Sequence, residues 1–382
     1  MLQNVVIVFG NDHSNHLGLV RSLGEVGINP CCVIVGTEKS SIAWSKYAKE
    51  FKFCESIEEG GEYIYDHYRN KEVKPIILTG ADDYVHYLDV NYDRFEPFFF
   101  FFNAGETGRV TKYMVKDVVS ALAEKHGLLI PRTRIYNNGE PFPDDITYPC
   151  FCKADTSVKY SKKSEDVCYS EDDLRALLNE SDVPRILIQD FIKKKTEHSY
   201  LGFAINHGKD VYVPYEIRYI RFTDKGYGAY NDCLLVEDEE IKNKIRDVLS
   251  EIGFEGIFSF EQILSAVDGK WYFTEINFRN DGFAYASTVG GANLAQLYCE
   301  SVVAGKLITP DTPLKPSVIT LDGSVELRLF VKKPIRWLYE WFTADCHLEY
   351  NRKDFKPFIR TLYKHISVNF NKVIKKFHAK YN

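Results

Sequence analysis

The sequence lacks any apolar run that could cross a bilayer. The apolar run Phe98–Phe102 has five residues, whereas a membrane-spanning helix needs about 20. The sequence also lacks cysteine pairs with the spacing of metal ligands, because its nine cysteines are scattered and only Cys31 and Cys32 are adjacent. This pattern is typical of buried, reduced thiols in a reducing compartment, and it argues against a zinc site.

Two further absences narrow the class of protein. No Gly-x-Gly-x-x-Gly fingerprint follows the first apolar segment, which ends in the single Gly10, so a dinucleotide-binding signature is missing. The formal net charge is −6, and such a chain lacks the overall positive charge that is typical of nucleic-acid binding. The N-terminus has no basic segment followed by a long apolar core, so no signal peptide is evident and we expect a cytoplasmic protein.

The first third of the chain alternates strand patterns with amphipathic helix patterns. Val5–Gly10 is a strand pattern, Leu17–Val26 has apolar residues at helical spacing, and Pro30–Val35 is the next strand pattern. A strand–helix–strand unit implies a parallel sheet. Pro75–Gly80 and Phe98–Phe102 continue the strand patterns, so we predict a Rossmann-like α/β domain over residues 1–111.

The rest of the chain predicts a mixed α+β organisation. A helix over Lys112–His126 ends at Gly127, which is a natural C-cap. Hairpin-like turns join several of the later strand patterns and indicate antiparallel pairing. These patterns are Tyr148–Lys153, Arg185–Ile192, Tyr200–Asn206, Asp210–Ile220, Phe258–Ser265 and Trp271–Ile276. We predict one lobe over residues 112–186, a second over 187–320 and a basic helical extension over 321–382.

Two neighbouring strand patterns carry oxygen ligands. Glu275 and Asn277 lie two residues apart, so they point to one face of a strand. A turn at Asp268-Gly269 would pair this strand with the preceding one and bring Glu261 near Glu275. Such oxygen donors suit Mg²⁺, and Arg279 on the same side could clamp a phosphate. The alternative is a solvated polar face on an edge hairpin; the apolar flanking residues make unpaired acids there costly.

Two lysines stand in apolar surroundings. Lys116 lies in the helix that ends at Gly127, and Lys153 ends the strand pattern from Tyr148. A lysine at a strand end or helix start is a good partner for phosphate. Taken singly, each is as readily explained as a surface residue whose stem covers apolar surface. Arg218, in the Tyr215–Phe222 pattern, is a candidate for contact with a substrate carboxylate or phosphate, or else an ordinary surface charge.

The order of these motifs resembles the ATP-grasp superfamily, over roughly residues 1–308. The matching features are a lysine before a helix-ending glycine and a proline, a lysine at the end of a strand, a strand that forms a hinge, an acid beyond the hinge, and an acid followed on the next strand by Glu-x-Asn and Arg. In this sequence they are Lys116, Gly127 and Pro131, Tyr148–Lys153, Ile188–Ile192, Glu197, Glu261, Glu275, Asn277 and Arg279.

The resemblance implies an ATP- and Mg²⁺-dependent carboxylate–amine ligase, with Mn²⁺ as an alternative ion and small-molecule carboxylate and amine substrates. It also implies roles for the matched residues. Lys116 and Lys153 would bind the phosphates, Gln189, Asp190 and Ile192 would line adenine, and Glu197 would bind the ribose. Glu261, Glu275 and Asn277 would bind the metal, and Arg279, Lys153 and Arg218 would contact the reacting groups. A small-molecule kinase of the same fold and a nucleotide-binding scaffold without activity are the alternatives.

Two features depart from the usual pattern of the family. Many members carry a glycine-rich loop after the second lysine, whereas Ala154–Lys163 has no glycine and is lysine-rich, as in D-aspartate-ligase-like and peptide-ligase-like members. The last 32 residues, 351–382, carry nine basic residues against Asp354 alone. Three readings of this extension stay open: a solvated helical face packed on the body, contact with an anionic membrane, or a site for an acidic partner. The sequence leaves a homo-oligomer open.

Overall fold

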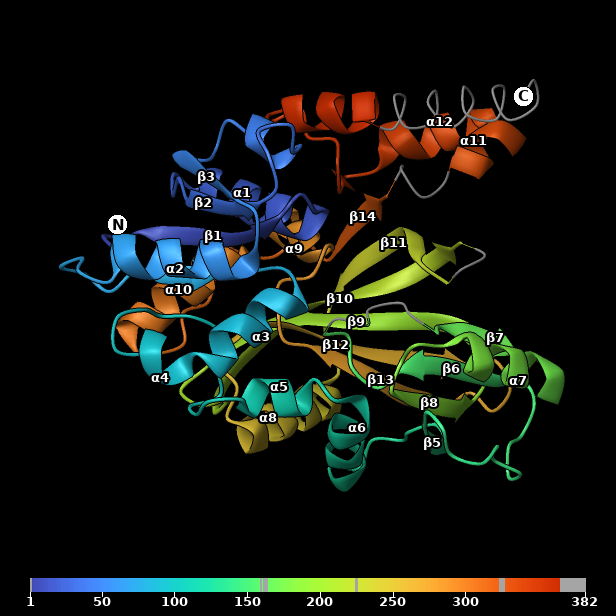
Figure 1. Cartoon of the computed structure of the whole chain (residues 1–382). Coiled ribbons are helices and arrows are strands. Elements are labelled where there is room, and N and C mark those ends of the chain that lie inside the picture. Colours follow the sequence, from blue (N-terminus) through green and yellow to red (C-terminus); the bar gives the residue numbers. More distant parts are fainter. Residues whose placement is uncertain (1, 159, 161–163, 224–225, 323–326, 365–382) are drawn as a thin grey trace, which may run out of the picture.

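The computed structural model describes residues 2–158, 160, 164–223, 226–322 and 327–364, and three β-sheets organise them (Figure 1). The first sheet is parallel throughout, in the order β3-β2-β1-β4. Its strands are β1 (Val6–Asn11), β2 (Cys31–Val35), β3 (Glu50–Cys54) and β4 (Ile76–Leu78). The predicted strand–helix–strand unit at the N-terminus is present, with α1 (Ser14–Gly24) between β1 and β2.

Successive residues of β1 point to opposite faces of this sheet, and both faces are covered. Val6 and Val8 pack in the core that includes residues of α1, whereas Ile7 and Phe9 pack in a second core. The helices of that second face are α2 (Ile57–Tyr68), α3 (Asp82–Val90) and α4 (Tyr92–Phe95). Burial on both sides explains why β1 is a continuous apolar run.

The prediction of a strand over Phe98–Phe102 was wrong. Within this run only Phe100 forms a bridge, an isolated one to Ile76; Phe98 ends the turn that follows α4, and the other three residues are irregular. The run is apolar because it fills the core: Phe99 and Phe101 pack in one cluster, and Phe102 packs in the other. A short buried run of this kind cannot be distinguished from a strand by hydrophobicity alone.

The predicted helix Lys112–His126 is divided into α5 (Arg109–Tyr113) and α6 (Lys116–Lys125). Val115 between them is extended and bridges Thr156. Asp155 supplies the missing cap of α6, because its carbonyl accepts a hydrogen bond from Lys116 N (2.8 Å) and its carboxylate accepts one from Asp117 N (3.3 Å). This break places Lys116 at the start of a helix beside the segment that follows Lys153.

The second sheet is small and antiparallel, in the order β5-β8-β6-β7. Its strands are β5 (Thr133–Asn137), β6 (Cys150–Ala154), β7 (Asp166–Cys168) and β8 (Arg185–Asp190), and α7 (Glu171–Glu180) covers one face. Three cysteines that are scattered in the sequence meet under α7 with their Sγ atoms within 4.8 Å of one another: Cys150, Cys152 and Cys168. Burial raises the pKa of each, so they stay protonated thiols in this apolar core.

The third sheet has the order β13-β12-β9-β10-β11-β14-β15 and is antiparallel except for the last pair. Its strands are β9 (Lys194–Ile205), β10 (Asp210–Phe222), β11 (Gly228–Leu235), β12 (Gly256–Ser265), β13 (Trp271–Asn277), β14 (Ser317–Leu321) and β15 (Cys346–His347). The accompanying helices are α8 (Glu239–Ile252), α9 (Ala284–Gly290) and α10 (Leu294–Ala304). The predicted boundary after residue 186 falls inside β8, which pairs within the small sheet; the division into domains stays a prediction.

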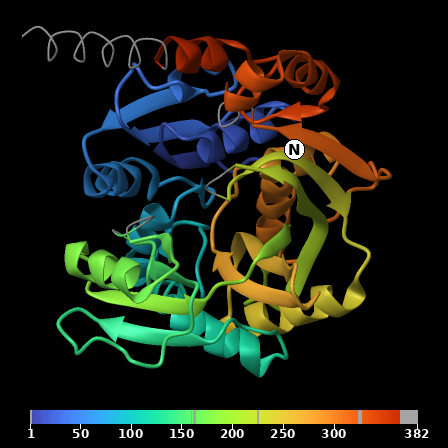
Figure 2. The ribbon, with the colours of Figure 1, turned by 90° about the vertical axis from the view of Figure 1, so that its right-hand side faces the viewer.

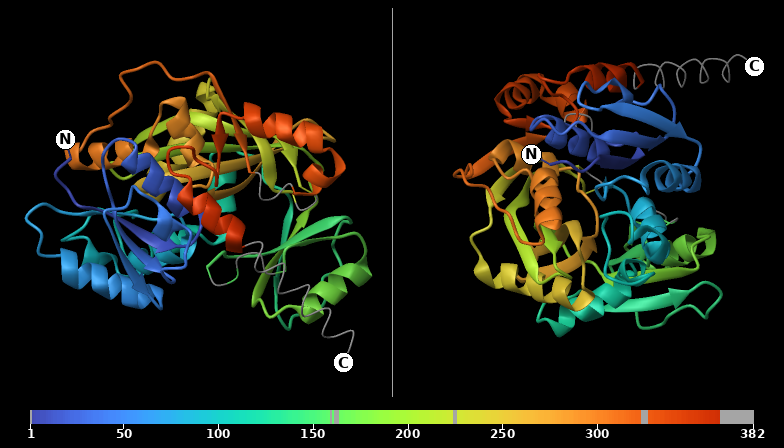
Figure 3. Two further views of the ribbon diagram at one scale, coloured as in Figure 1. Left: turned by 90° about the horizontal axis from the view of Figure 1, so that it is seen from above. Right: turned by 90° about the vertical axis from the view of Figure 1, so that its left-hand side faces the viewer.

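The C-terminal segment returns to the first sheet. It contains α11 (Leu327–Lys332), α12 (Pro334–Thr343) and a helical stretch over residues 356–364. The rest of the predicted basic extension, residues 365–382, lies outside the described residues. Figures 2 and 3 show this segment at one end of the molecule and the small sheet at the other. Within the described residues, no helix combines the length and the apolar character that crossing a membrane requires.

Candidate functional site

The pairing of β12 with β13 brings the predicted metal ligands together. Glu261 lies directly opposite Glu275 in the register, so both side chains point to the same face of the sheet. Asn277 completes the group, because its Nδ2 donates hydrogen bonds to Glu261 Oε1 (2.9 Å) and Glu275 Oε1 (3.4 Å). Glu275 and Asn277 on β13 and Glu261 on β12 therefore form a compact set of side chains with oxygen donors.

Both predicted lysines approach this set, Lys153 from β6 of the small sheet and Lys116 from the first turn of α6. Lys153, on β6, interacts electrostatically with Glu275, Lys116 and Glu261, and Lys116 Nζ donates to the carbonyl of Ala154 (3.4 Å). The pKa of Lys153 is lowered to about 8, chiefly by burial and also by Lys116, while Glu275 opposes the shift. Two lysines, from α6 and β6, thus lie within electrostatic range of a carboxylate on β13, and Lys153 also of one on β12.

The two carboxylates titrate in opposite directions. Burial raises the pKa of Glu261 well above its ordinary value, and the neighbouring Glu275 and Glu197 raise it further. Burial also acts to raise the pKa of Glu275, but Lys116, Lys153 and Arg279 outweigh it and the net shift is downward. Arg279 acts to lower the pKa of Glu261, but it does not outweigh burial and the neighbouring acids.

A divalent cation fits this set of donors. Carboxylate and amide oxygens are the ligands that Mg²⁺ prefers, and a cation would relieve the repulsion that raises the pKa of Glu261. The amide oxygen of Asn277 points away from the two carboxylates. Arg279 Nη2 donates to this Oδ1 (3.0 Å), while Nδ2 of Asn277 faces the carboxylates. Ligation by Asn277 therefore requires its amide to rotate so that Oδ1 faces Glu261 and Glu275.

Arg279 joins this cluster to the first sheet. Its Nε lies 3.4 Å from Asp82 Oδ1, at the first turn of α3, and its Nη1 lies 3.2 Å from Asp281 Oδ2. The next residue, Asn280, donates from its backbone to the carbonyl of Thr79 (3.1 Å) and from its side chain to the carbonyl of Asn15 (3.0 Å). Segments that follow the carboxyl ends of β1 and β4 therefore border the site, where ligands of α/β sheets commonly lie.

Glu197 lies on the same face of the large sheet as Glu261, and it is held by a lysine that sequence reasoning missed. Lys194 Nζ donates to Glu197 and to the carbonyl of Gly226 (3.2 Å). Burial raises the pKa of Glu197, and Lys194 opposes the shift. Lys194 stands among three consecutive lysines, so its residue type alone could not single it out.

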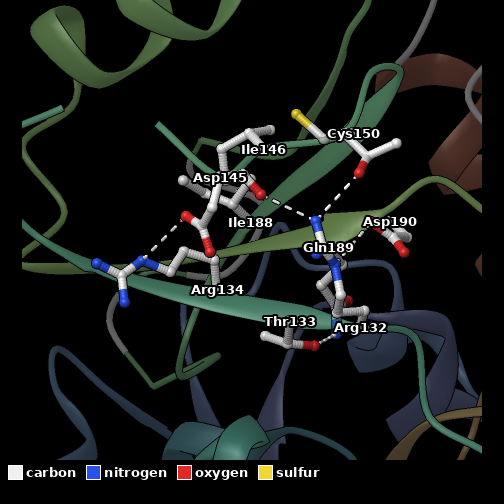
Figure 4. Close-up of a pocket in the computed structure, with 10 residues that line it drawn as sticks. Arg132, Thr133, Arg134, Asp145, Ile146, Cys150, Ile188, Gln189 and Asp190 are labelled. Atoms are coloured by element: carbon white, nitrogen blue, oxygen red, sulfur yellow. Dashed lines mark hydrogen bonds and ion pairs between the residues drawn. The ribbon is translucent and has the colours of Figure 1, made fainter. Parts of the chain in front are cut away.

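The predicted hinge residues lie at and just beyond the C-terminal end of β8, an interior strand of the small sheet, where Gln189 and Asp190 line a small cavity. Gln189 is buried, and its Nε2 donates to Thr133 Oγ1 (2.9 Å) (Figure 4). Asp190 is more exposed and pairs loosely with Arg132 (3.6 Å), and Ile192 is partly exposed. The cavity beside Gln189 measures about 60 Å³, well below the 300 Å³ or so of ordinary ligand pockets, so it does not hold a purine base.

Arg218 does not join the cluster. It lies opposite His198 in the sheet, whereas Glu261 lies opposite Ser199, so Arg218 and Glu261 point to opposite faces. Its guanidinium is bound to Asp232 (3.2 Å) instead. The adjacent Tyr219 faces the acids, which raise its pKa together with burial, the larger cause. The catalytic role predicted for Arg218 has no geometric support, because the register of β10 turns this residue away from the other candidates.

Comparison with known proteins adds to this geometry. No family model matches the chain, and no curated protein matches its sequence. Solved structures match it along most of its length. An ADP complex of N5-carboxyaminoimidazole ribonucleotide synthetase has 15% identity and a TM-score of 0.66, over 88% of this chain and 86% of that one. L-amino acid ligase from Bacillus licheniformis has 13% identity and a TM-score of 0.61, over 79% of this chain and 75% of that one.

Biotin carboxylase from Campylobacter jejuni, in a nucleotide complex, has 15% identity and a TM-score of 0.61, over 82% of this chain and 74% of that one. Identities this low leave the substrate open and bear on the fold alone. The likeness extends over the mixed parallel and antiparallel sheets that carry the cluster of lysines and acids. The chain has the ATP-grasp fold, as the order of its motifs indicates.

Proposed function

We propose that this chain is an ATP- and Mg²⁺-dependent ligase that activates a carboxylate as an acyl phosphate and joins it to an amine, releasing ADP and phosphate. One observation carries the proposal: two lysines of the small lobe, Lys116 and Lys153, face the donor set of Glu261, Glu275 and Asn277 across the boundary between the lobes. Opposite charges gathered from distant segments suit a metal-bound triphosphate better than they suit packing.

In this proposal the chain acts by position and charge. Lys116 and Lys153 bind the phosphate oxygens, and Glu261, Glu275 and Asn277 hold Mg²⁺, which draws charge from the transferring phosphoryl group. Arg279 stabilises the negative charge that develops between the phosphate and the carboxylate, and Asp82 and Asp281 orient its guanidinium. Glu197 is proposed to exchange its contact with Lys194 for one with the ribose. The backbone of Gln189, Asp190 and Ile192 is proposed to line adenine outside the small cavity beside the Gln189 side chain.

The test is release of ADP from ATP and Mg²⁺ in the presence of pooled carboxylates and pooled amines, with mass spectrometry of the product. A ligase releases ADP fully only when both pools are present and yields a condensed product. Release with the carboxylate pool alone, together with a phosphorylated product that persists, would point to a kinase. If no pair of pools supports turnover and calorimetry detects no nucleotide binding, the proposal is wrong.

Binding of nucleotide is expected to charge Lys153. Without nucleotide its pKa is about 8, because burial disfavours the ammonium, so at pH 8.5 the amine is largely neutral. Phosphate beside it favours the ammonium and raises the pKa, so binding of Mg²⁺-free ADP at pH 8.5 takes up a proton. Calorimetry in buffers of different ionisation enthalpy measures this uptake. Lys153→Arg, whose side chain stays charged, is the control and should show none; equal uptake in both proteins would refute the assignment.

A further inference from the structure

The C-terminal segment exposes an unusual amount of apolar surface. On α12, the side chains of Ile335, Leu338, Tyr339 and Phe342 are 84%, 43%, 68% and 81% exposed. Their spacing of three, four and seven residues from Ile335 places them on one face of the helix. An apolar helix face that points to solvent indicates an interaction surface.

This orientation is imposed by the opposite face of α12. Glu340 is buried there and binds Arg221 of β10, with Nη2–Oε2 at 2.6 Å. Trp341 packs against His347 and Phe358, with ring centroids 4.5 and 6.0 Å away. Rotating the helix to bury Phe342 would break the buried ion pair between Glu340 and Arg221, which is costly, although Arg336 of the same helix (2.8 Å from Glu340) would move with the carboxylate. The apolar residues therefore stay outside.

The helical stretch over residues 356–364 repeats the pattern next to α12. Phe355, Ile359, Leu362 and Tyr363 are 52%, 47%, 44% and 63% exposed, again at helical spacing. Phe358 links this stretch to α12 through Trp341. Figures 1 and 2 show both helices along the same end of the molecule, away from the small sheet. We call these four exposed side chains, together with the four of α12, the outer apolar face.

The charge around the outer apolar face indicates the kind of partner that it binds. Residues 332–364 contain eight lysines and arginines against four acids, and two of those acids, Glu340 and Asp354, are buried in ion pairs. The chain as a whole carries −6, so positive charge is concentrated at this end. Exposed apolar and aromatic side chains bordered by lysines and arginines are typical of helices that lie in the interface of an anionic bilayer.

We propose that the outer apolar face docks this protein on an anionic membrane surface. The apolar side chains enter the boundary between headgroups and acyl chains, and the flanking cations, among them Lys333, Lys353 and Lys356, bind lipid phosphates. Both helices lie flat on the bilayer, so the contact is peripheral and reversible.

Co-sedimentation of the full chain with lipid vesicles tests the proposal. Vesicles of phosphatidylcholine with phosphatidylglycerol should bind the protein, vesicles of phosphatidylcholine alone should bind it weakly, and added salt should weaken binding by screening. The double variant Ile335→Ser, Phe342→Ser should lower the partition coefficient for anionic vesicles at least about tenfold. Val267→Ser, which removes an 81% exposed side chain in the turn between β12 and β13, is the matched control and should bind like wild type.

Light scattering after gel filtration, and nucleotide binding, accompany the vesicle assay. The serine variant should bind nucleotide as wild type does, because neither residue lies in the proposed site. A wild-type dimer that the double variant converts to monomer, without vesicle binding by either, would assign the face to a second copy and overturn the proposal. Salt-sensitive vesicle binding that survives in the double variant would also overturn it, since the apolar contacts would then be dispensable.

Discussion

Replacing Glu275 by Gln is expected to lower the kcat of ATP-dependent turnover by more than about 100-fold, because outer-shell changes at metal sites already cost about 10–100-fold and Glu275 is placed to bind the ion directly. The substitution removes one negative charge and keeps the shape of the side chain. The pairing of β12 with β13 should survive, since it is formed by the backbone. Turnover is measured by ADP release, and folding by the thermal melt.

Binding of Mg²⁺-free ADP separates the role of Glu275 from simple damage to the site. Loss of a carboxylate beside the phosphates should leave this affinity unchanged or increase it, because Glu275 interacts with the same Lys116 and Lys153 that bind phosphate. Glu240→Gln makes the same chemical change at an exposed position of α8, where Glu240 pairs with Lys244 (2.7 Å), and is the matched control. ADP release that continues unchanged in Glu275→Gln would rule out the metal assignment.

The largest loss of stability is expected from Arg21→Met. Arg21 is fully buried in α1 and donates to the carboxylate of Asp354 (3.3 Å) and to the carbonyls of Leu348 (3.1 Å), Glu349 (2.9 Å) and Asp354 (3.1 Å). Methionine fills the space but leaves a buried carboxylate without its cation. Such a change costs about 3–5 kcal/mol of unfolding free energy. Urea unfolding followed by fluorescence measures it.

Two companion variants identify the cause of that loss. Arg246→Met removes an exposed guanidinium from α8, and its effect should stay within about 0.5 kcal/mol. In Arg21→Met with Asp354→Leu, no carboxylate is left unpaired, so the double variant should be less destabilised than the sum of the single changes. Additive losses would mean that Arg21 and Asp354 act independently, against the geometry of the pair.

Much of the candidate site could be predicted because its residues are close in sequence or follow a strand's alternation. Glu275 and Asn277 share a face by spacing alone, and a short turn leads from Glu261 to the same place. Lys153 could be recognised as the charged end of an apolar strand. The proximity of residues far apart in sequence, such as Lys153 and Glu275, was predicted from the resemblance and not from any local pattern.

What could not be predicted depends on register and on tertiary contacts. Arg218 and Tyr219 are neighbours on β10, and only the pairing with β9 determines which of them faces the acids. The break at Val115 arises because Asp155, from a different element, caps α6. The role of Lys194 depends on where β9 begins, because the strand starts at this residue and places its amine beside Glu197.

The distribution of buried thiols gives this protein a built-in set of chemical reporters on its own unfolding. All nine cysteines are buried, and burial raises the pKa of each, so alkylating reagents should react slowly while the fold is closed. Three lie in the parallel sheet, three in the small sheet, and three with the large sheet and α10. Mass spectrometry of brief labelling under mild denaturant would therefore rank the three regions by how readily each opens.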